Sequence, residues 1–376
     1  MRRQSAATTA LWISSLDHSL PNRSKAPPLA AHSKFDAHSR TLALNQVKQD
    51  SQDHLVCAVD LGGTNLRAAN IDRQGSIHER FRVSTPDTDN PNEIVSAIAS
   101  AVTECANQAA TRSEQIQAVS VVVPGSVHAD SGVIVNAPNI PAIVGFDLGQ
   151  ALTADLHRPI SLENDANAAA VGEMWCGAGR PCQTIICLTL GTGVGSGIIL
   201  EGKLWRGIDG TGGEIGHLSL VPIGGVKCKC GGVGCLEVYA SATAIVRMTR
   251  EGLPNHPQSI LHVQPELDLS AKEVGRAANE GDAFALEVFR NMGMYLGIAM
   301  ANVVNIFNPE MIIVGGGVSE SFDLFATYAR DEIIKRAFPV PAQRCQVVKA
   351  EWGDDAGLLG AAWLALQPMS RQDSHD

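Results

Sequence analysis

The 376-residue sequence predicts an α/β fold, and three observations support this prediction. Apolar runs of strand length alternate with amphipathic stretches of helix length along most of the chain. Two of these strands, 55–60 and 184–191, lead into turns built from glycine and threonine that lie 129 residues apart. Apolar residues make up 45% of the chain, a share typical of globular proteins. Two similar strand–turn units suggest a duplicated α/β architecture, although the match is too short to establish duplication alone.

The predicted fold begins at Leu55, after an N-terminal extension, residues 1–54, that differs in composition. The extension contains no glycine or cysteine, is rich in serine, alanine, asparagine, glutamine and histidine, and shows no strong hydrophobic period. We expect it to be disordered and outside the functional fold, because it offers too little apolar surface to bury. Its early arginines and serines faintly resemble a transit peptide, but an extension without function is the simpler interpretation.

The first half of the fold is expected to contain five strands and three helices. The strands are predicted at 55–60, 66–72, 76–85, 116–123 and 159–164, and the helices at 91–110, 147–157 and 165–175. The helix at 91–110 has the clearest start, because Asn90 is a good N-cap and Pro91 suits the first helical position.

The same alternation restarts in the second half. Strands are predicted at 184–191, 195–202, 311–318 and 345–352, and helices at 269–280, 282–306, 319–337 and 354–367. Because strands and helices keep alternating, this half is also expected to be an α/β unit.

Composition excludes several classes of protein. The net charge of −10 argues against binding to nucleic acid or to an acidic membrane surface. The sequence has no run of 18 apolar residues, so we expect no membrane span. The nine cysteines are odd in number and no secretory segment is evident, which favours a reducing compartment, the cytoplasm.

Glycine is concentrated where backbone is expected to approach a ligand, since residues 191–234 hold 15 of the 36 glycines. Three glycine turns follow buried strands, at 60–65, 191–195 and 315–317. An ordinary hairpin or tight packing could explain any one of them. Together they favour a phosphate- or nucleotide-binding site, with Asp60 able to hold a hydrated magnesium ion. The candidate residues are Asp60, Gly62, Gly63, Thr64, Asn65, Gly191, Thr192, Gly193, Val194, Gly195, Gly315, Gly316 and Gly317.

The strongest local signal is a set of one histidine and three cysteines. His217 is followed by Cys228, Cys230 and Cys235 in a polar, glycine-rich loop. One imidazole and three thiolates are typical of a closed, tetrahedral zinc site, so the metal is expected to be structural. A redox cluster or unrelated buried thiols are the alternatives, but neither explains why three cysteines fall so close together.

Acidic residues accompany these motifs. Glu214 precedes His217 by three positions and Glu237 follows Cys235 by two, so the zinc loop would bring both toward one place. Asp165, between a predicted strand and an alanine-rich helix, could be a general base for a hydroxyl nucleophile. From these residues alone, the simpler interpretation is a helix N-cap.

Taken together, the motifs DLGGTNLR, NAPNI, ENDANAAA, LGTGVGSG, GEIGH and CKCGGVGCLE resemble the ROK family of sugar kinases over residues 55–367. The resemblance implies an actin-like, hexokinase-type (ribonuclease H-like) fold with two lobes, a cleft between them and a structural zinc loop. The small lobe would comprise 55–164 and 354–368, and the large lobe 165–353 with the zinc loop 217–237. The stretch GCLEVYASATAIVR is most similar to the family's bacterial glucokinases.

The resemblance also implies an activity: ATP-dependent phosphorylation of the 6-hydroxyl of glucose, with Mg2+ as cofactor and Zn2+ as structural metal. Asp165 would be the base and would also contact the sugar, together with Asn139, Asn164, Glu214, His217 and Glu237. Turns 60–65 and 191–195 would hold the ATP phosphates, and 315–317 the adenosine. Asn65 departs from the lysine that many members carry, which removes a charge near the phosphates.

Three alternatives share the motifs or the family. The sugar could be N-acetylmannosamine, N-acetylglucosamine or fructose, and the phosphoryl donor could be polyphosphate. A sugar-responsive repressor is disfavoured, because residues 1–55 lack the pattern of a helix-turn-helix and the chain is acidic. The partners implied are therefore a small sugar and ATP, with no nucleic acid and no membrane, in a homodimer or homotetramer.

Overall fold

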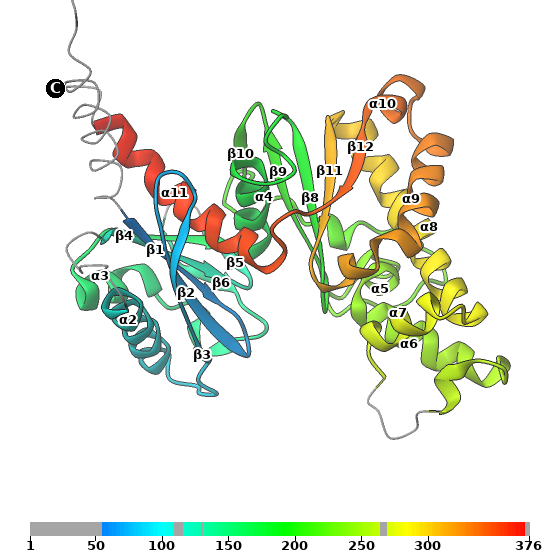
Figure 1. The fold of residues 1–376 in the computed structure, drawn as a ribbon, viewed down its shortest axis with the longest axis horizontal. Helices are drawn as coiled ribbons and strands as arrows, with labels where there is room; N and C mark the ends of the chain where they lie inside the picture. Colours follow the sequence, from blue (N-terminus) through cyan, green and yellow to red (C-terminus); the bar gives the residue numbers. More distant parts are fainter. Residues whose placement is uncertain (1–54, 109–115, 129–130, 264–268, 373–376) are drawn as a thin grey trace, which may run out of the picture. The chain divides into compact units, whose positions relative to one another are not determined.

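A computed structural model describes residues 55–108, 116–128, 131–263 and 269–372 of the chain. The extension predicted to be disordered, residues 1–54, lies outside the described residues. The described part contains two five-stranded sheets and one two-stranded sheet, with helices between and around them (Figure 1).

The first sheet has the strand order β3-β2-β1-β4-β7. Its strands are β1 (Leu55–Leu61), β2 (Asn65–Ile71), β3 (Ile77–Ser84), β4 (Ile116–Val123) and β7 (Ile160–Asn164). Strands β1, β2 and β3 pair antiparallel, whereas β4 pairs parallel to β1 and β7 parallel to β4. All five strands were predicted, within one residue at each end.

The second sheet repeats this arrangement with the order β10-β9-β8-β11-β12. Its strands are β8 (Ile185–Leu190), β9 (Val194–Leu200), β10 (Lys203–Trp205), β11 (Met311–Gly315) and β12 (Gln346–Lys349). Three strands again pair antiparallel, and two are added in parallel on the other side of the first. The shared topology supports the predicted duplication. Of the five strands in this sheet, only the short strand β10 was not predicted.

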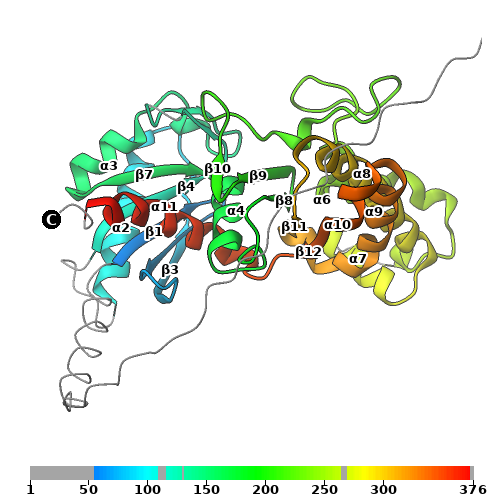
Figure 2. The same ribbon diagram turned by 90° about the horizontal axis from the view of Figure 1, so that it is seen from above.

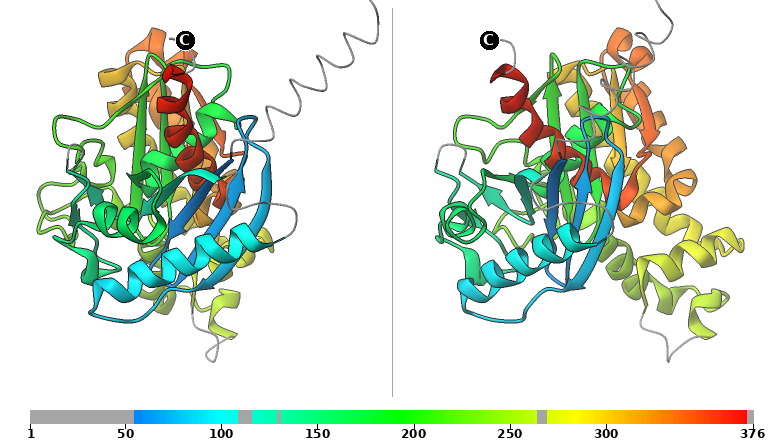
Figure 3. Two further views of the ribbon diagram at one scale, coloured as in Figure 1. Left: turned by 90° about the vertical axis from the view of Figure 1, so that its left-hand side faces the viewer. Right: turned by 60° about the vertical axis from the view of Figure 1, so that its left-hand side comes forward.

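The first sheet is covered on both faces, as its nearly continuous apolar strands require. Alternate residues of β1 point to opposite sides. Leu55 and Val59 pack in one cluster with helix α2 (Pro91–Asn107), while Val56 and Ala58 pack in another with helix α11 (Ala356–Gln372). Figure 3 shows α2 running along its face of the sheet. Asn90 caps α2 and Pro91 is its first residue, as predicted.

The second sheet follows the same rule. Ile186 and Leu188 of β8 pack with helix α8 (Ala283–Phe307), and Ile185 and Cys187 pack with helix α4 (Asp165–Trp175) on the opposite face. Helices α4 and α11 lie side by side (Figure 2).

The remaining elements are short or cover the second sheet. They are α3 (Leu148–Leu156), α5 (Glu237–Ala240), α6 (Ala242–Gly252), α7 (Ala271–Asn279), α9 (Phe322–Arg336), α10 (Pro339–Arg344), the strands β5 (Ser126–Val127) and β6 (Ile134–Asn136), and 3-10 turns that include η3 (Ile215–His217) and η6 (Gly317–Ser321). Helices α5, α6 and α10 were not predicted. Helix α9 begins three residues later than expected because η6 precedes it. No helix among the described residues is long and apolar enough to span a bilayer.

Candidate functional site

Asp165 begins helix α4 at the edge where β7 ends. The N-cap of α4 is Asn164, whose side chain accepts a hydrogen bond from the backbone N–H of Asn167 at 3.0 Å. The interpretation of Asp165 as the N-cap was therefore wrong, because the residue before it does this work. The Oδ1 atom of Asp165 instead accepts hydrogen bonds from the Ala166 N–H (2.8 Å) and the Asn164 amide (3.0 Å).

The environment of Asp165 makes its carboxyl less acidic than usual. The side chain is open to solvent, so a ligand can reach it, yet protein atoms crowd it on most sides. This desolvation, with a smaller contribution from the negative charge of Asp60, raises the pKa of Asp165 to about 6. A carboxylate that is accessible but poorly hydrated is suited to accept a proton near neutral pH.

Asp60, at the end of β1, is held by a cation. Arg67 of β2 forms a close ion pair with the Asp60 carboxylate, and its guanidinium also donates to the backbone oxygen of Asp354 at 2.9 Å. Asp60 is about one-fifth exposed, so it remains reachable from solvent. Asn65, which stands where many members of the resembled family carry lysine, accepts a hydrogen bond from Arg82 at 3.2 Å. Positive charge at this turn therefore comes from β2 and β3.

The first glycine turn, 60–65, is tightly packed at its glycines. Gly62 donates its N–H to the backbone oxygen of Asn65 at 2.9 Å. A Cβ atom at Gly63 would lie only 2.9 Å from that of Asn139. The turn thus brings the predicted phosphate-binding glycines against Asn139, one of the predicted sugar contacts.

A small polar cavity of about 40 Å3 lies beside Asp165. Its lining includes Asn164 and Asn167 from the start of α4, and Glu214 from the segment before η3. The predicted sugar-contacting residues Asn164 and Glu214 therefore line the same cavity, although they are 50 residues apart in sequence.

The four predicted zinc ligands form one cluster. Their ligand atoms all lie within 4.8 Å of one another. The Sγ atom of Cys228 is 3.7 Å from Nδ1 of His217, and the Sγ atoms of Cys230 and Cys235 are also 3.7 Å apart. Thiolates about 2.3 Å from one zinc ion at tetrahedral angles would lie roughly 3.8 Å apart. The geometry fits a closed Cys3His zinc site.

His217 faces two ways. Its Nδ1 atom points to Cys228, while its Nε2 atom is 4.0 Å from Oε2 of Glu214. One imidazole therefore links the cysteine cluster to a residue that lines the small polar cavity.

Glu237 joins the zinc loop to the second glycine turn, residues 191–195. Its Oε2 atom accepts the Val194 N–H at 3.0 Å, and Oε1 lies 4.0 Å from Sγ of Cys228. A Cβ atom at Gly193 would meet the same carboxylate at 2.2 Å, which explains the glycine at that position. Glu237 therefore supports the turn backbone, a contact that its prediction as a sugar ligand did not include.

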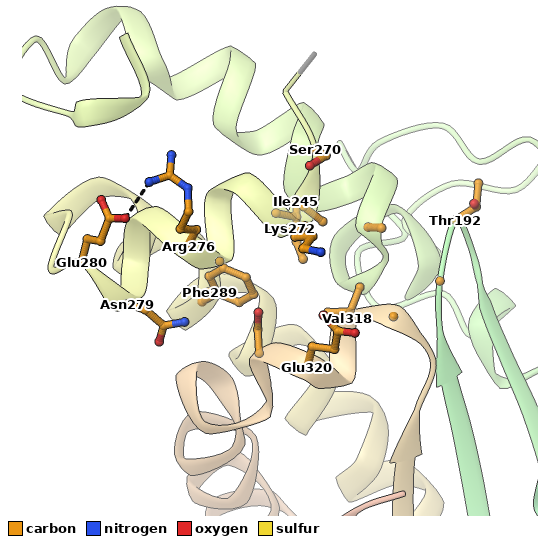
Figure 4. Close-up of a pocket in the computed structure, with 16 residues that line it drawn as sticks. Thr192, Ile245, Ser270, Lys272, Arg276, Asn279, Glu280, Phe289, Val318 and Glu320 are labelled. Carbon is orange, nitrogen blue, oxygen red and sulfur yellow. Dashed lines mark hydrogen bonds and ion pairs between the residues drawn. The ribbon is translucent and has the colours of Figure 1, made fainter. Parts of the chain in front are cut away.

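A large cavity of about 760 Å3 has a volume within the range of small-molecule sites. It opens beside the second glycine turn, at Gly191 and Thr192, and extends between α6, α7 and η6 (Figure 4). Phe289, Ile245 and Val318 supply apolar surface, and polar groups come from the residues Ser270, Lys272, Arg276, Asn279, Glu280, Glu320 and Ser321. The arrangement suits a ligand with a flat apolar part and a charged part.

Two predicted nucleotide contacts have a different explanation in the structure. A Cβ atom at Gly195 would meet Oγ1 of Thr189 at 2.6 Å and Ala166 at 3.0 Å, so this glycine lets α4 approach β9. Gly316 has φ +77° and packs against the Leu190 backbone, where a Cβ would lie 2.5 Å from the carbonyl oxygen. Tight packing, one alternative considered for the second turn, favours glycine at both positions, and their contact with a nucleotide stays a prediction. Of the turn 315–317, only Gly317 lines the large cavity.

Sequence reasoning missed Lys272, Arg276 and Phe289. They come from α7 and α8, and only tertiary packing brings these helices to the second glycine turn. The ammonium group of Lys272 reaches into the cavity between Ile245 and η6, whereas Arg276 is paired with Glu280 at 2.6 Å (Figure 4). A lysine in the first turn of a predicted helix carries no local signal that would mark it as a ligand contact.

Comparison with known proteins gives one consistent family. The model of the ROK family matches residues 56–368. A glucokinase of Halalkalibacterium halodurans is 38% identical over 317 residues, covering 84% of this chain and 96% of that protein. A glucokinase of Thermotoga maritima is 36% identical over 307 residues, covering 81% and 95%.

A solved structure agrees in fold. The crystal structure of a ROK family glucokinase from Streptomyces griseus, in complex with glucose and AMPPNP, matches with a TM-score of 0.72 and 35% identity. The match covers 83% of this chain and 99% of that one. The α/β, hexokinase-type fold expected from the resemblance is therefore confirmed. With the family model matched along nearly all of its described length, this chain belongs to the ROK family.

Proposed function

We propose that this chain is an ATP-dependent glucokinase, which transfers the γ-phosphoryl group of ATP to the 6-hydroxyl of glucose. Its similar relatives from Halalkalibacterium halodurans and Thermotoga maritima are glucokinases of comparable length. The observation that carries the proposal is Asp165, a solvent-accessible carboxyl with a pKa of about 6, next to a polar cavity lined by Asn164 and Glu214.

Asp165 would act as the general base. With a pKa of about 6 it is mostly ionised at neutral pH and still basic enough to take a proton. The O6 atom of glucose would form a bond to the γ-phosphorus while its proton passes to Asp165. The bond from the γ-phosphorus to its bridging oxygen would break, and ADP would leave with that electron pair.

Carboxylates and amides around the cavity would choose the sugar. Asn139, Asn164, Glu214, His217 and Glu237 are the proposed contacts, and such groups suit the hydroxyls of a hexose. A site built this way rejects analogues that lack a hydroxyl, because its polar groups are then left unpaired.

ATP would occupy the large cavity. Gly191 and Thr192, at one end, would face the phosphates, while Phe289 and Val318 would pack against the base. The other turn residues, Gly62, Gly63, Thr64 and Asn65, would approach the terminal phosphate from the opposite sheet.

Two metals fit the residues present. Asp60 would hold a hydrated Mg2+ ion, which neutralises phosphate charge when bound. His217, Cys228, Cys230 and Cys235 would hold a structural Zn2+ ion, since four protein ligands leave no open position. Because His217 also faces Glu214, the zinc site would orient the sugar pocket.

We propose that the two sheets belong to two lobes, 55–164 with 354–368 and 165–353. The polar cavity of about 40 Å3 has room for a few water molecules but not for a hexose. The cavity would therefore form only part of the sugar site, and closure of the two lobes over a bound sugar would complete that site. Closure would exclude water, which otherwise competes with the sugar as phosphoryl acceptor.

We also propose a homodimer or homotetramer in the cytoplasm that binds no nucleic acid. Ile306, Ile334, Phe338 and Val340 are exposed apolar side chains where α8, α9 and α10 meet. None of the nine cysteines is in a disulfide, which fits a reducing compartment. Light scattering of the wild type and Phe338→Ser would test the assembly, and a DNA gel-shift assay at low salt would test nucleic-acid binding.

A coupled ADP-release assay tests the proposed activity. We expect glucose to give the highest kcat/KM among glucose, fructose, N-acetylglucosamine and N-acetylmannosamine, with ATP preferred over polyphosphate. A higher kcat/KM with another sugar would make that sugar the substrate in place of glucose. If no sugar caused ADP release, the proposed kinase activity would be wrong.

A further inference from the structure

Glu163, two residues before Asp165, is a buried acid that the proposed reaction does not use. Its side chain lies at the end of β7 and the residue is only 6% exposed. Burying a carboxylate is costly unless it is paired and hydrogen-bonded. The partner here is Arg206, which follows strand β10 of the other sheet. Its Nε atom donates to Oε2 of Glu163 at 2.8 Å, and its second nitrogen lies 2.7 Å from the same oxygen.

The other carboxylate oxygen of Glu163 binds the segment that begins α4. Oε1 accepts the side-chain amide of Asn167 at 2.9 Å and the backbone N–H of Asn164 at 3.1 Å. Both residues line the small polar cavity. The carboxylate therefore connects Arg206 to the same stretch of backbone that presents the proposed base.

Arg206 also begins the loop that carries Glu214. The backbone oxygen of Arg206 accepts the Gly212 N–H at 2.9 Å, which closes the loop on itself. Beyond it, Ser196 holds the end of the loop, because its hydroxyl donates to the Gly213 oxygen and accepts the Ile215 N–H at 3.2 Å. Gly210, Gly212 and Glu214 form the second wall of the small polar cavity.

We propose that Arg206 is a positioning residue for the sugar. By binding Glu163 it holds the wall that carries Glu214 against the wall that carries Asn164 and Asp165. Neither residue lines the small polar cavity or the large cavity, so the pair would act through the residues it fixes. This inference rests on the proposed function, because it assigns the small polar cavity to the hexose.

The kinetic consequence is specific to one substrate. Loss of the pair would let the two walls drift apart and weaken glucose binding, while the ATP cavity is lined by other residues. Small displacements of bound reactants can cost roughly ten- to hundredfold in rate or affinity. We therefore expect Arg206→Met to raise the glucose KM at least about tenfold and to leave the ATP KM within about twofold.

The test compares Arg206→Met, Glu163→Gln and the double variant, with Arg180→Met as matched control. Arg180 forms an exposed pair with Glu351 at 3.4 Å, away from both cavities. Glucose KM, ATP KM and kcat are measured for each protein, together with the melting temperature and with glucose affinity by calorimetry. Arg206→Lys, which keeps the charge, should recover part of the glucose affinity.

The outcomes separate a positioning role from a purely structural one. If the inference holds, the double variant has a glucose KM no higher than the worse single variant, because both changes remove the same link. The double variant also leaves no unpaired buried charge, which keeps the comparison valid if a single variant folds poorly. A lower melting temperature with an unchanged glucose KM in all three would overturn the inference.

The proposed function is tested separately by the wild type. A wild-type protein that phosphorylates no hexose and binds none would overturn both proposals. If the wild type is active and Arg206→Met leaves the glucose KM unchanged, only the proposed role of Arg206 is overturned.

Discussion

The two glycine turns occupy equivalent places in two sheets of the same topology, but they have acquired different surroundings. The first follows Asp60 at the end of β1, where an ion pair with Arg67 and the nearby Asp165 concentrate charge. The second follows Thr189 at the end of β8, where Glu237 ties the turn backbone to the zinc cluster and the large cavity opens beside Thr192.

The repeated scaffold would thus serve the two ends of the proposed reaction in different ways. The β1–β2 hairpin carries ionisable side chains, as expected of the end where a proton and a phosphoryl group move. The β8–β9 hairpin is almost free of charge and offers backbone and space, as expected of the end that holds a nucleotide. Variants of each side should therefore affect different kinetic constants.

The largest effect is expected at Asp165. Asp165→Asn removes the proposed base and keeps the shape, so kcat should fall roughly 100- to 10,000-fold. Glucose should still bind, because the amide keeps its hydrogen-bonding ability. Turnover by coupled assay and glucose affinity by calorimetry would check this, and near-normal turnover would rule out Asp165 as the base.

The pH dependence of the wild type follows from the same group. The pKa of Asp165 is raised to about 6, so kcat should fall as the pH drops through 6 and the base becomes protonated. The raised pKa means that the folded state binds a proton more tightly than the unfolded chain, so this group makes folding less favourable as the pH rises from about 4 to 6. Asp165→Asn should therefore melt above the wild type at pH 8 and close to it at pH 4.

Zinc removal should act on the second turn. Cys230 is exposed, so Cys230→Ser disturbs packing little but removes one proposed ligand. We expect about one zinc per chain in the wild type, a large loss of zinc in the variant, and a fall in activity as the hold of Glu237 on Val194 loosens. Metal analysis of each protein, together with activity measurements, would check both expectations. Cys182→Ser, outside the cluster, is the control, and full zinc content in Cys230→Ser would contradict the assignment.

A smaller effect is expected at Asp60. Asp60→Asn should lower kcat about ten- to hundredfold and raise the Mg2+ concentration needed for half-maximal rate, with little change in the glucose KM. A magnesium titration at saturating ATP measures this. Unchanged magnesium dependence would leave Asp60 as only the partner of Arg67.

The smallest effect is expected at Lys272. If its ammonium faces the phosphates, Lys272→Met should raise the ATP KM about tenfold, a change of about 1.4 kcal/mol, and spare the glucose KM. Calorimetry should find weaker ADP binding and unchanged adenosine binding. Lys203→Met, on an exposed position of β10, serves as the control. If adenosine binding were weakened as much as ADP binding, Lys272 would instead contact the base or the ribose.

Sequence reasoning succeeded where the determining residues are close together in the chain. The three cysteines fall within eight positions, and the strands are continuous apolar runs, so neither needed tertiary information. It failed where neighbours compete or distant helices meet. Asn164 and Asp165 are both good N-caps, and only the backbone geometry shows that Asn164 is the cap.

The glycines illustrate the same limit. A glycine in a turn indicates that some group approaches the backbone closely, but it does not identify the group. At Gly195 and Gly316 protein atoms pack close to the glycine. The large cavity is assembled from α6, α7, α8 and η6, which are separated by tens of residues. The pairing of Glu163 with Arg206 likewise joins two sheets and leaves no trace in local sequence.

In the proposed reaction, the two turns act together in one transfer of phosphate from ATP to glucose. The most direct measurement is 31P and 13C NMR of the product formed from ATP and uniformly 13C-labelled glucose by the wild-type protein. We expect one product, with phosphorus coupled to C6 and one ADP formed per phosphate transferred. Phosphate on another carbon, or ADP and free phosphate without a sugar phosphate, would contradict it.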